Sequence, residues 1–140
     1  MRVLIADDEP RVRLALRLLL RQYPGMAVVG EADNVERALE LTVRQQPDLV
    51  LLDWELPGCN STAVLERLRA TRQDLIVIAL SGRPEAYRVV LDAGVDAFIS
   101  KGDSPDRLLS TLQAKLRISS RDVGVERCLS NATVPRLVSP

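Results

Sequence analysis

The sequence predicts an α/β protein with a doubly wound, five-stranded parallel sheet and helices on both of its faces. Two observations predict this fold class. Apolar runs and amphipathic segments alternate five times along the chain, which is the pattern of successive βα units. The run Leu49-Val50-Leu51-Leu52 contains four aliphatic residues in succession. Such a run cannot alternate between core and solvent, so we expect a central parallel strand covered on both faces.

The expected strands are the short apolar runs, and each ends at a polar residue or a turn. They occupy residues 2–6, 26–30, 48–53, 75–80 and 96–100. The second follows Pro24-Gly25, which close the preceding helix, and includes Gly30 as its last residue. The fourth is apolar almost throughout, as expected for a buried strand.

The expected helices follow the strands, and their ends carry recognisable signals. They run from residue 10 to about 22, from 34 to about 46, from 61 or 62 to about 71, from 84 to 94, and from 104 to about 118. Pro10 suits the first position of a helix, because the missing N–H would have no partner there. Asn34 can cap the second helix, and Gly94 can end the fourth.

The length of 140 residues suits one domain with a substantial core. From Ser119 onward, apolar residues no longer recur at helical spacing. We therefore expect a domain over residues 1–118, followed over 119–140 by a linker or partly ordered extension without an effector domain.

Composition and charge exclude several classes of protein. The net charge of zero gives no reason to expect a nucleic-acid or membrane surface. No stretch is long and apolar enough for a transmembrane helix, and the N-terminus lacks the regions of a signal peptide. Cys59 and Cys128 are too isolated for a disulfide framework or a zinc site. We expect a cytoplasmic chain, and without histidine it cannot itself carry a phosphohistidine.

Polar side chains follow four of the five expected strands. They are Asp7, Asp8, Asp53, Ser81 and Lys101. The carboxyl ends of parallel strands meet at one edge of a sheet, so these groups should lie together. Three converging carboxylates repel one another and favour a magnesium ion. A carboxylate beside magnesium can attack a phosphoryl group and form an acyl phosphate, while the hydroxyl and the ammonium neutralise charge.

Each residue alone has a simpler interpretation. A strand-end aspartate is usually a turn residue or a helix cap, and Ser81-Gly82 alone is a plain turn. Phe98 is more often a core residue than a switch. The combination is far more specific, because such groups would rarely coincide at four strand ends by chance.

This pattern resembles the receiver domain of bacterial two-component response regulators, which has a flavodoxin-like fold. The most specific matches are residues 4–10, 51–58 and 98–101, and the resemblance covers residues 1 to about 118. Residues 98–109 are most similar to the subgroup with a C-terminal helix-turn-helix effector. The resemblance therefore implies the receiver part of a transcription regulator.

The resemblance implies that Asp53 accepts phosphate from a sensor histidine kinase. Asp8 and Asp53 would bind Mg²⁺, for which Mn²⁺ can substitute, together with the backbone carbonyl of Glu55. Asp7 would act on the ion largely through water. Such a chain is not an enzyme with a separate substrate; it is a phosphoacceptor that catalyses its own phosphorylation and dephosphorylation.

The resemblance also implies a switch. Ser81 would follow the phosphoryl group, Lys101 would pair with its oxygens, and Phe98 would swing inward, which changes the surface around the fourth helix and fifth strand. Some positions depart from the family pattern. Gly102 stands where many receivers have proline, and residues 59–61 differ from the usual acidic residue or asparagine followed by glycine. Glu55 and Arg83 occupy positions that influence phosphoryl lifetime in the family.

The first expected helix carries more apolar residues than one stripe needs. The inward stripe comprises Val12, Ala15, Leu16, Leu19 and Leu20. Leu14 and Leu18 lie on a different face with several arginines. They are either part of a wide buried arc or an exposed partner surface. In the family this helix docks on the kinase, and in the subgroup the first and fifth helices can form a homodimer.

Two other functions stay open. A phosphatase of the haloacid dehalogenase type would need a second aspartate two residues after the first, where this chain has Glu55. A receiver-like binding module could work without phosphorylation, although the intact acid pocket, hydroxyl and lysine argue against it.

Overall fold

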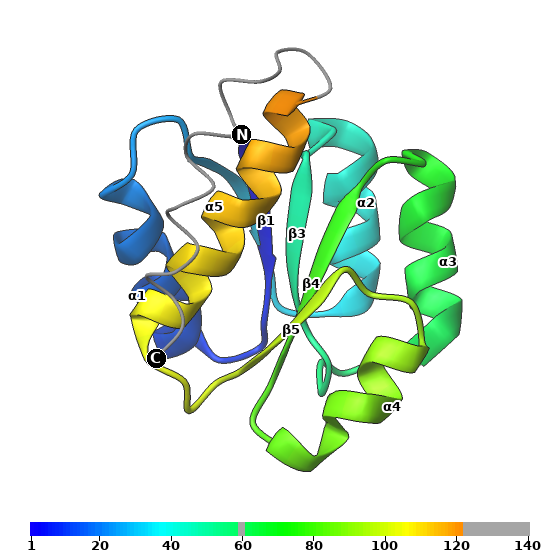
Figure 1. Cartoon of the computed structure of the whole chain (residues 1–140). Helices are drawn as coiled ribbons and strands as arrows, with labels where there is room; N and C mark the ends of the chain where they lie inside the picture. The colour runs from blue at the N-terminus through cyan, green and yellow to red at the C-terminus, as the bar shows by residue number, and fades with distance from the viewer. Residues whose placement is uncertain (59–60, 122–140) are drawn as a thin grey trace. The chain divides into compact units, whose positions relative to one another are not determined.

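Five parallel strands form one sheet in the order β2-β1-β3-β4-β5 (Figure 1). The strands are β1 (Arg2–Ala6), β2 (Ala27–Ala32), β3 (Leu49–Asp53), β4 (Ile76–Ser81) and β5 (Ala97–Ser100). The chain begins in the sheet interior at β1, adds β2 on one side, and then places β3, β4 and β5 on the other. This arrangement confirms the predicted doubly wound α/β fold.

The computed structural model describes residues 1–58 and 61–121 of the chain. The chain divides into two units, Met1–Lys101 and Gly102–Pro140. The first unit contains the sheet with its helices, and the second contains α5 (Pro105–Arg121). Cys59, Cys128 and most of the expected extension lie outside the described residues, so the extension stays a prediction.

The remaining helices are α1 (Pro10–Arg21), α2 (Val35–Gln45), α3 (Ser61–Thr71), the 3₁₀ turn η1 (Pro84–Ala86) and α4 (Tyr87–Asp92). Their ends follow the expected signals. Pro10 opens α1, and the Asn34 side chain accepts a hydrogen bond from the Arg37 N–H at 2.9 Å. No helix within the described part of the chain is long and apolar enough to span a membrane.

The two faces of the sheet carry different helices. Buried side chains of α2, α3 and α4 form one cluster with alternate residues of the strands, including Leu4, Val50, Leu52, Val77 and Phe98. α1 contacts β1 and β2 and lies on the other side of the sheet from α2 and α3 (Figure 1). Within α1, Leu16 and Leu20 are buried. All residues of β3 are buried, which confirms its predicted central position.

The ends of β2 and α5 lie beyond their predicted boundaries. β2 continues past Gly30 to Ala32, and its register against β1 shifts between Val3 and Leu4. A Cβ atom at Gly30 would lie 3.1 Å from a methyl carbon of Leu4, so this glycine permits close packing inside the strand, which continues beyond the predicted end. α5 extends past Ile118 to Arg121, because the polar residues there do not break a helix as proline would.

Candidate functional site

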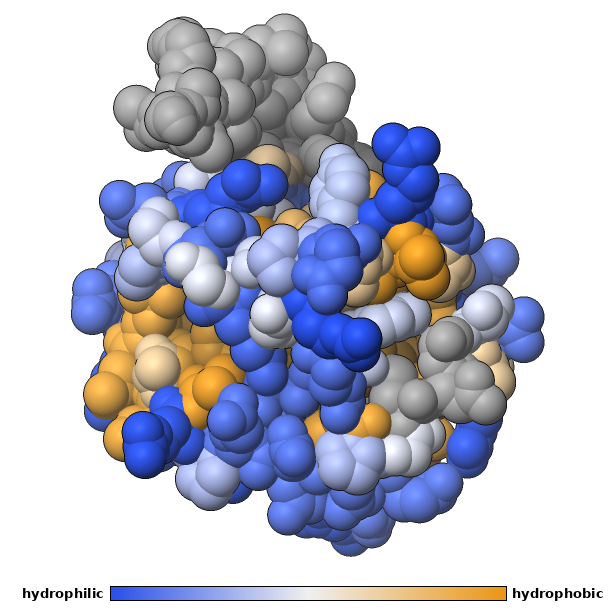
Figure 2. Space-filling view, turned by 90° about the horizontal axis from the view of Figure 1, so that it is seen from below, coloured by the Kyte–Doolittle hydropathy of each residue, from blue (hydrophilic) through white to orange (hydrophobic). Residues whose placement is uncertain are grey.

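The carboxyl ends of the strands lie at the lower edge of the sheet in Figure 1. Figure 2 looks onto this edge, and hydrophilic residues occupy the middle of the face. Asp7 and Asp8 follow β1, while Asp53 is the last residue of β3. The order of strands reverses between β1 and β3, and this is the place where open α/β sheets form their functional crevice.

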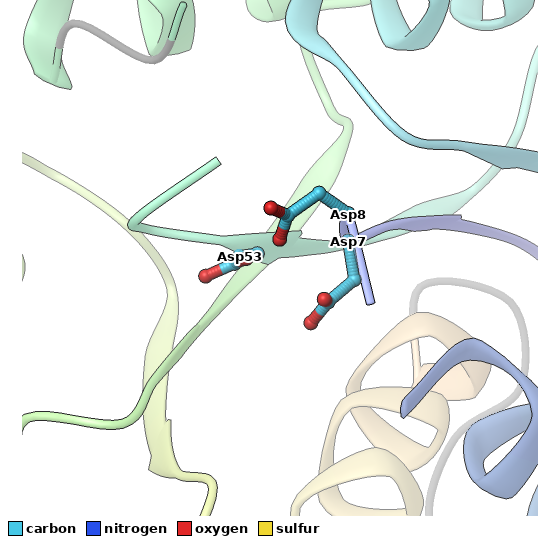
Figure 3. A group of neighbouring side chains, drawn as sticks. All are labelled: Asp7, Asp8 and Asp53. Atoms are coloured by element: carbon cyan, nitrogen blue, oxygen red, sulfur yellow. The ribbon is translucent and has the colours of Figure 1, made fainter. Parts of the chain in front are cut away.

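The three aspartates form one acidic cluster (Figure 3). A carboxylate oxygen from each of Asp7, Asp8 and Asp53 lies within 4.8 Å of those of the other two. Asp7 and Asp53 are 0% and 1% exposed, whereas Asp8 is exposed. Burying two carboxylates this close together is unfavourable unless positive charge accompanies them.

Lys101 supplies positive charge within the protein. Its Nζ atom lies 2.8 Å from Oδ2 of Asp7 and 3.4 Å from Oδ2 of Asp53. Burial lowers the pKa of Lys101, but the short polar contact with Asp7 and the charges of Asp53 and Asp7 outweigh burial and raise it overall. The ammonium therefore stays charged and joins the ends of β1 and β3.

The donor set fits a hard divalent cation. Oδ2 of Asp7 is buried and, among the described residues, has no hydrogen bond of good geometry, although the Lys101 ammonium lies close to it. Asp8 gives the cluster an exposed side, so an ion could keep several waters, as Mg²⁺ prefers. The Glu55 N–H donates a hydrogen bond to Oδ1 of Asp53 at 2.9 Å, which holds the Glu55 backbone beside the cluster. These residues fit Mg²⁺.

Asp53 has an altered acidity. The pKa of Asp53 is raised to about 6, and burial is the largest cause. The Asp7 charge raises this pKa further, whereas the hydrogen bond from the Glu55 N–H and the Lys101 ammonium lower it. The next residue, Trp54, is partly buried against the core, and its N–H donates to the Leu80 carbonyl at 2.7 Å. This hydrogen bond fixes the backbone directly after Asp53, where the chain turns away from β3.

Ser81 is fully buried and already has a partner. Its Oγ donates a hydrogen bond to Oε2 of Glu55 at 2.6 Å and accepts one from the Arg83 N–H at 3.0 Å. The Gly82 N–H donates to Oε1 of Glu55 at 3.1 Å. The sequence placed Ser81 at the site but did not predict its partner. A signal existed, since Glu55 follows a strand that is paired directly with β4.

A second residue that sequence reasoning missed is Arg13 of α1. Its Nη1 donates to the backbone carbonyl of Asp7 at 2.7 Å, and its Nε lies 3.3 Å from Oε1 of Glu31. Arg13 thus holds the peptide between Asp7 and Asp8 against the end of β2. Its position one turn into the helix after the acid pair was the available signal.

The remaining predicted residues lie elsewhere. Phe98 is 8% exposed within the core cluster, and its ring meets the Tyr87 ring edge-on at 5.6 Å. Leu14 and Leu18 are 44% and 47% exposed, so they do not belong to a buried arc. Ala15 is also exposed, contrary to the expected inward stripe, because the buried line of α1 runs through Leu16 and Leu20.

The fold and the site together define a class of protein. A sheet of order 2-1-3-4-5 with two acidic residues after β1, an acid at the end of β3, a hydroxyl at the end of β4 and a lysine after β5 is the arrangement of a receiver. The chain belongs to the response regulator receiver domain family, which matches residues 3–113. It is a receiver domain of the two-component type, and the standard function of this family is phosphorylation-dependent signalling.

Relatives support the same assignment. The nitrate/nitrite response regulator protein NarL of Escherichia coli K12 is 32% identical over 139 residues, which cover 98% of this chain and 61% of NarL. Response regulator MprA of Mycobacterium sp. strain KMS is 37% identical over 125 residues, which cover 88% of this chain and 54% of MprA. The chain thus spans less than two thirds of the length of these relatives.

Solved structures agree with the sequence relatives. A two-component response regulator of the LuxR family from Aurantimonas sp. SI85-9A1 has a TM-score of 0.74 at 28% identity, covering 82% of this chain and 84% of that one. A DNA-binding response regulator of the LuxR family from Staphylococcus aureus has a TM-score of 0.71 at 27% identity, covering 81% and 96%.

Proposed function

We propose that Asp53 is the phosphoacceptor of this receiver and that a sensor histidine kinase is the donor. A carboxylate oxygen of Asp53 attacks phosphorus, the new O–P bond replaces the P–N bond to the kinase histidine, and the electron pair of that bond returns to the imidazole. The observation that carries this proposal is the buried Asp53 carboxylate, which belongs to the acidic cluster and lies 3.4 Å from the Lys101 ammonium.

The acidic cluster would hold the divalent ion. Asp7, Asp8 and Asp53 would contribute carboxylates and Glu55 its backbone carbonyl, and bound Mg²⁺ would neutralise charge on the phosphoryl oxygens. Lys101 would also neutralise charge on the phosphoryl oxygens, because its Nζ lies 3.4 Å from the Asp53 carboxylate. Ser81 would donate its hydroxyl proton to a phosphoryl oxygen, and Phe98 would then move inward. The same groups would serve both phosphorylation and dephosphorylation.

At the level of the whole protein, we propose that residues 1–118 form the receiver part of a transcription regulator. The relatives NarL and MprA are response regulators longer than this chain, and a LuxR-family structural neighbour is a DNA-binding protein. Phosphorylation would change the surface around α4 and β5. A homodimer through α1 and α5 is the assembly that the subgroup suggests.

The test is intact-mass measurement after incubation with acetyl phosphate and Mg²⁺. The wild type should gain one phosphoryl group, and Asp53→Asn should gain none. Asp8→Asn should need more Mg²⁺ for the same extent of labelling. Asp74→Asn removes an exposed carboxylate outside the cluster and should behave as the wild type.

Two outcomes would contradict the proposal. An Asp53→Asn protein that gains phosphate at the wild-type rate would show that another residue is the acceptor. A folded wild type that gains no phosphate and binds no beryllofluoride would favour a binding module that works without phosphorylation.

A further inference from the structure

The side chain of Glu55 binds two hydrogen-bond donors at the end of β4. Ser81 Oγ donates to Oε2 at 2.6 Å, and the Gly82 N–H donates to Oε1 at 3.1 Å. Each carboxylate oxygen therefore accepts one hydrogen bond. Ser81 is fully buried and Glu55 is exposed, so an anion from the surface reaches a hydroxyl in the interior.

The two donors lie beside the proposed acceptor. β3 and β4 are paired neighbours, with Asp53 opposite Leu80, and Ser81 follows in the same strand. The Glu55 N–H also donates to Asp53 Oδ1, so one residue contacts the acceptor with its backbone and Ser81 with its side chain. The side chain of Glu55 thus connects the turn after β3 to the loop after β4.

The Ser81 hydroxyl cannot serve two anions at once. A serine hydroxyl has one proton, and here it is donated to the Glu55 carboxylate. A phosphoryl group on Asp53 would need that proton for one of its oxygens. Its negative charge would also repel the Glu55 carboxylate at short range. A charge-assisted hydrogen bond must therefore be given up before the second can form.

We propose that Glu55 is an internal competitor of the phosphoryl group and a positioning residue for Ser81. In the unphosphorylated protein, the Glu55 carboxylate accepts hydrogen bonds from the Ser81 hydroxyl and the Gly82 N–H. These hydrogen bonds break when Asp53 carries a phosphoryl group. This inference rests on the proposed phosphoacceptor function. Its consequence is that Ser81 is held away from the switched position until a stronger anion arrives, so Glu55 weakens phosphoryl-analogue binding.

The experiment is a double-mutant cycle of Glu55 and Ser81. The affinity of each variant for beryllofluoride is measured by titration with Mg²⁺ present and fluoride constant, and binding is monitored by ¹⁹F NMR. Glu55→Ala should tighten binding about tenfold, the value of one charge-assisted hydrogen bond. In a Ser81→Ala background, the same change should tighten binding less than about threefold, because the competed hydroxyl is already absent. Glu55→Gln should lie between Glu55→Ala and the wild type.

A matched control removes a nearby charge without the contact. Glu85 pairs with Arg83 at 3.7 Å and is well exposed, so Glu85→Ala should change binding less than about twofold. Equal tightening by Glu55→Ala with and without Ser81 would show simple charge repulsion and overturn the proposal, as would no tightening. If Glu55→Ala does not fold, Glu55→Gln in the two backgrounds gives the same comparison.

The two proposals fail in different ways. In one case, the wild type binds beryllofluoride and is labelled by acetyl phosphate, but Glu55→Ala binds beryllofluoride no more tightly. This result overturns the competition by Glu55 and leaves the phosphoacceptor function intact. A folded wild type that neither binds beryllofluoride nor accepts phosphate overturns both.

Discussion

The ammonium of Lys101 lies 2.8 Å from a buried oxygen of Asp7. That oxygen has no hydrogen bond of good geometry from the described residues, so the ion pair is its main compensation for burial. Lys101 is 3.4 Å from Asp53, so it contacts Asp7 more closely than the proposed acceptor. A cation in the acidic cluster would neutralise Asp7, and Lys101 could then pair with the phosphoryl group.

The first prediction concerns Lys101→Met, which keeps an unbranched side chain of similar length and removes its charge. Without divalent ions, the variant should lose about 1–3 kcal/mol of unfolding free energy, because Asp7 stays buried without its partner. Saturating Mg²⁺ should recover part of this loss, and labelling by acetyl phosphate should slow at least about tenfold. Urea unfolding with EDTA or Mg²⁺ measures the first effect. Lys115→Met is the control and should change neither the stability nor the labelling rate. If Lys101→Met loses the same unfolding free energy with and without Mg²⁺, the ion does not compensate the charge of Asp7 and the prediction is wrong.

The second prediction concerns the pH dependence of stability. The pKa of Asp53 is about 6 in the folded chain, against an ordinary value of 3.8. Between these values the folded state binds more protons than the unfolded state, so the unfolding free energy falls as pH rises through this window. Asp53→Asn should therefore stabilise the protein above pH 6 in EDTA, by at most about 3 kcal/mol, and this gain should shrink toward pH 4.

Urea unfolding between pH 4 and about 8 measures this difference. Asp48→Asn is the control, because the pKa of Asp48 is shifted in the opposite direction. Burial raises the pKa of Asp48, but hydrogen bonds from Arg2 and Arg72 and the charge of Arg72 lower it overall. Removing that carboxylate should destabilise the protein at neutral pH. A gain for Asp53→Asn that is the same at every pH would contradict the assigned pKa.

The third prediction concerns the switch. Phe98 is the only phenylalanine in the chain, so its ring signals need no sequential assignment. Beryllofluoride with Mg²⁺ should shift the NMR signals of Phe98 and Tyr87 together, because the rings are in edge-on contact at 5.6 Å. Ser81→Ala should reduce these shifts even when the analogue is bound. Shifts confined to residues beside Asp53 would contradict propagation to β5.

The fourth prediction concerns Leu14 and Leu18 on α1, which are 44% and 47% exposed. Replacing both with alanine should cost less than about 1 kcal/mol of stability and slow phosphotransfer from the cognate kinase about tenfold, or weaken dimerisation. Labelling by acetyl phosphate should not change, since it needs no docking. Leu16→Ala is the buried control and should cost about 2–5 kcal/mol. A double variant as unstable as this control would exclude the partner surface.

The fold could be predicted because its signals are local. The aliphatic run of β3, Pro10 and Asn34 each decide a backbone choice within a few residues. The acidic cluster followed from topology, since parallel strands bring their ends to one edge. By contrast, the pairing of β3 with β4 brings Glu55 near Ser81, but their hydrogen bond also depends on side-chain rotamers, which the sequence pattern does not specify. The continuation of β2 through Gly30 depends on how tightly two strands approach.

Trp54 gives this receiver its own optical probe. It is the only tryptophan of the chain, it directly follows Asp53, and its backbone is tied to Leu80 of the neighbouring strand. Indole emission responds to the charges and the solvent around it, and both should change when a cation or a phosphoryl group arrives at the neighbouring carboxylate. Intrinsic fluorescence can therefore follow occupancy of the site in real time, without a dye and without interference from other tryptophans.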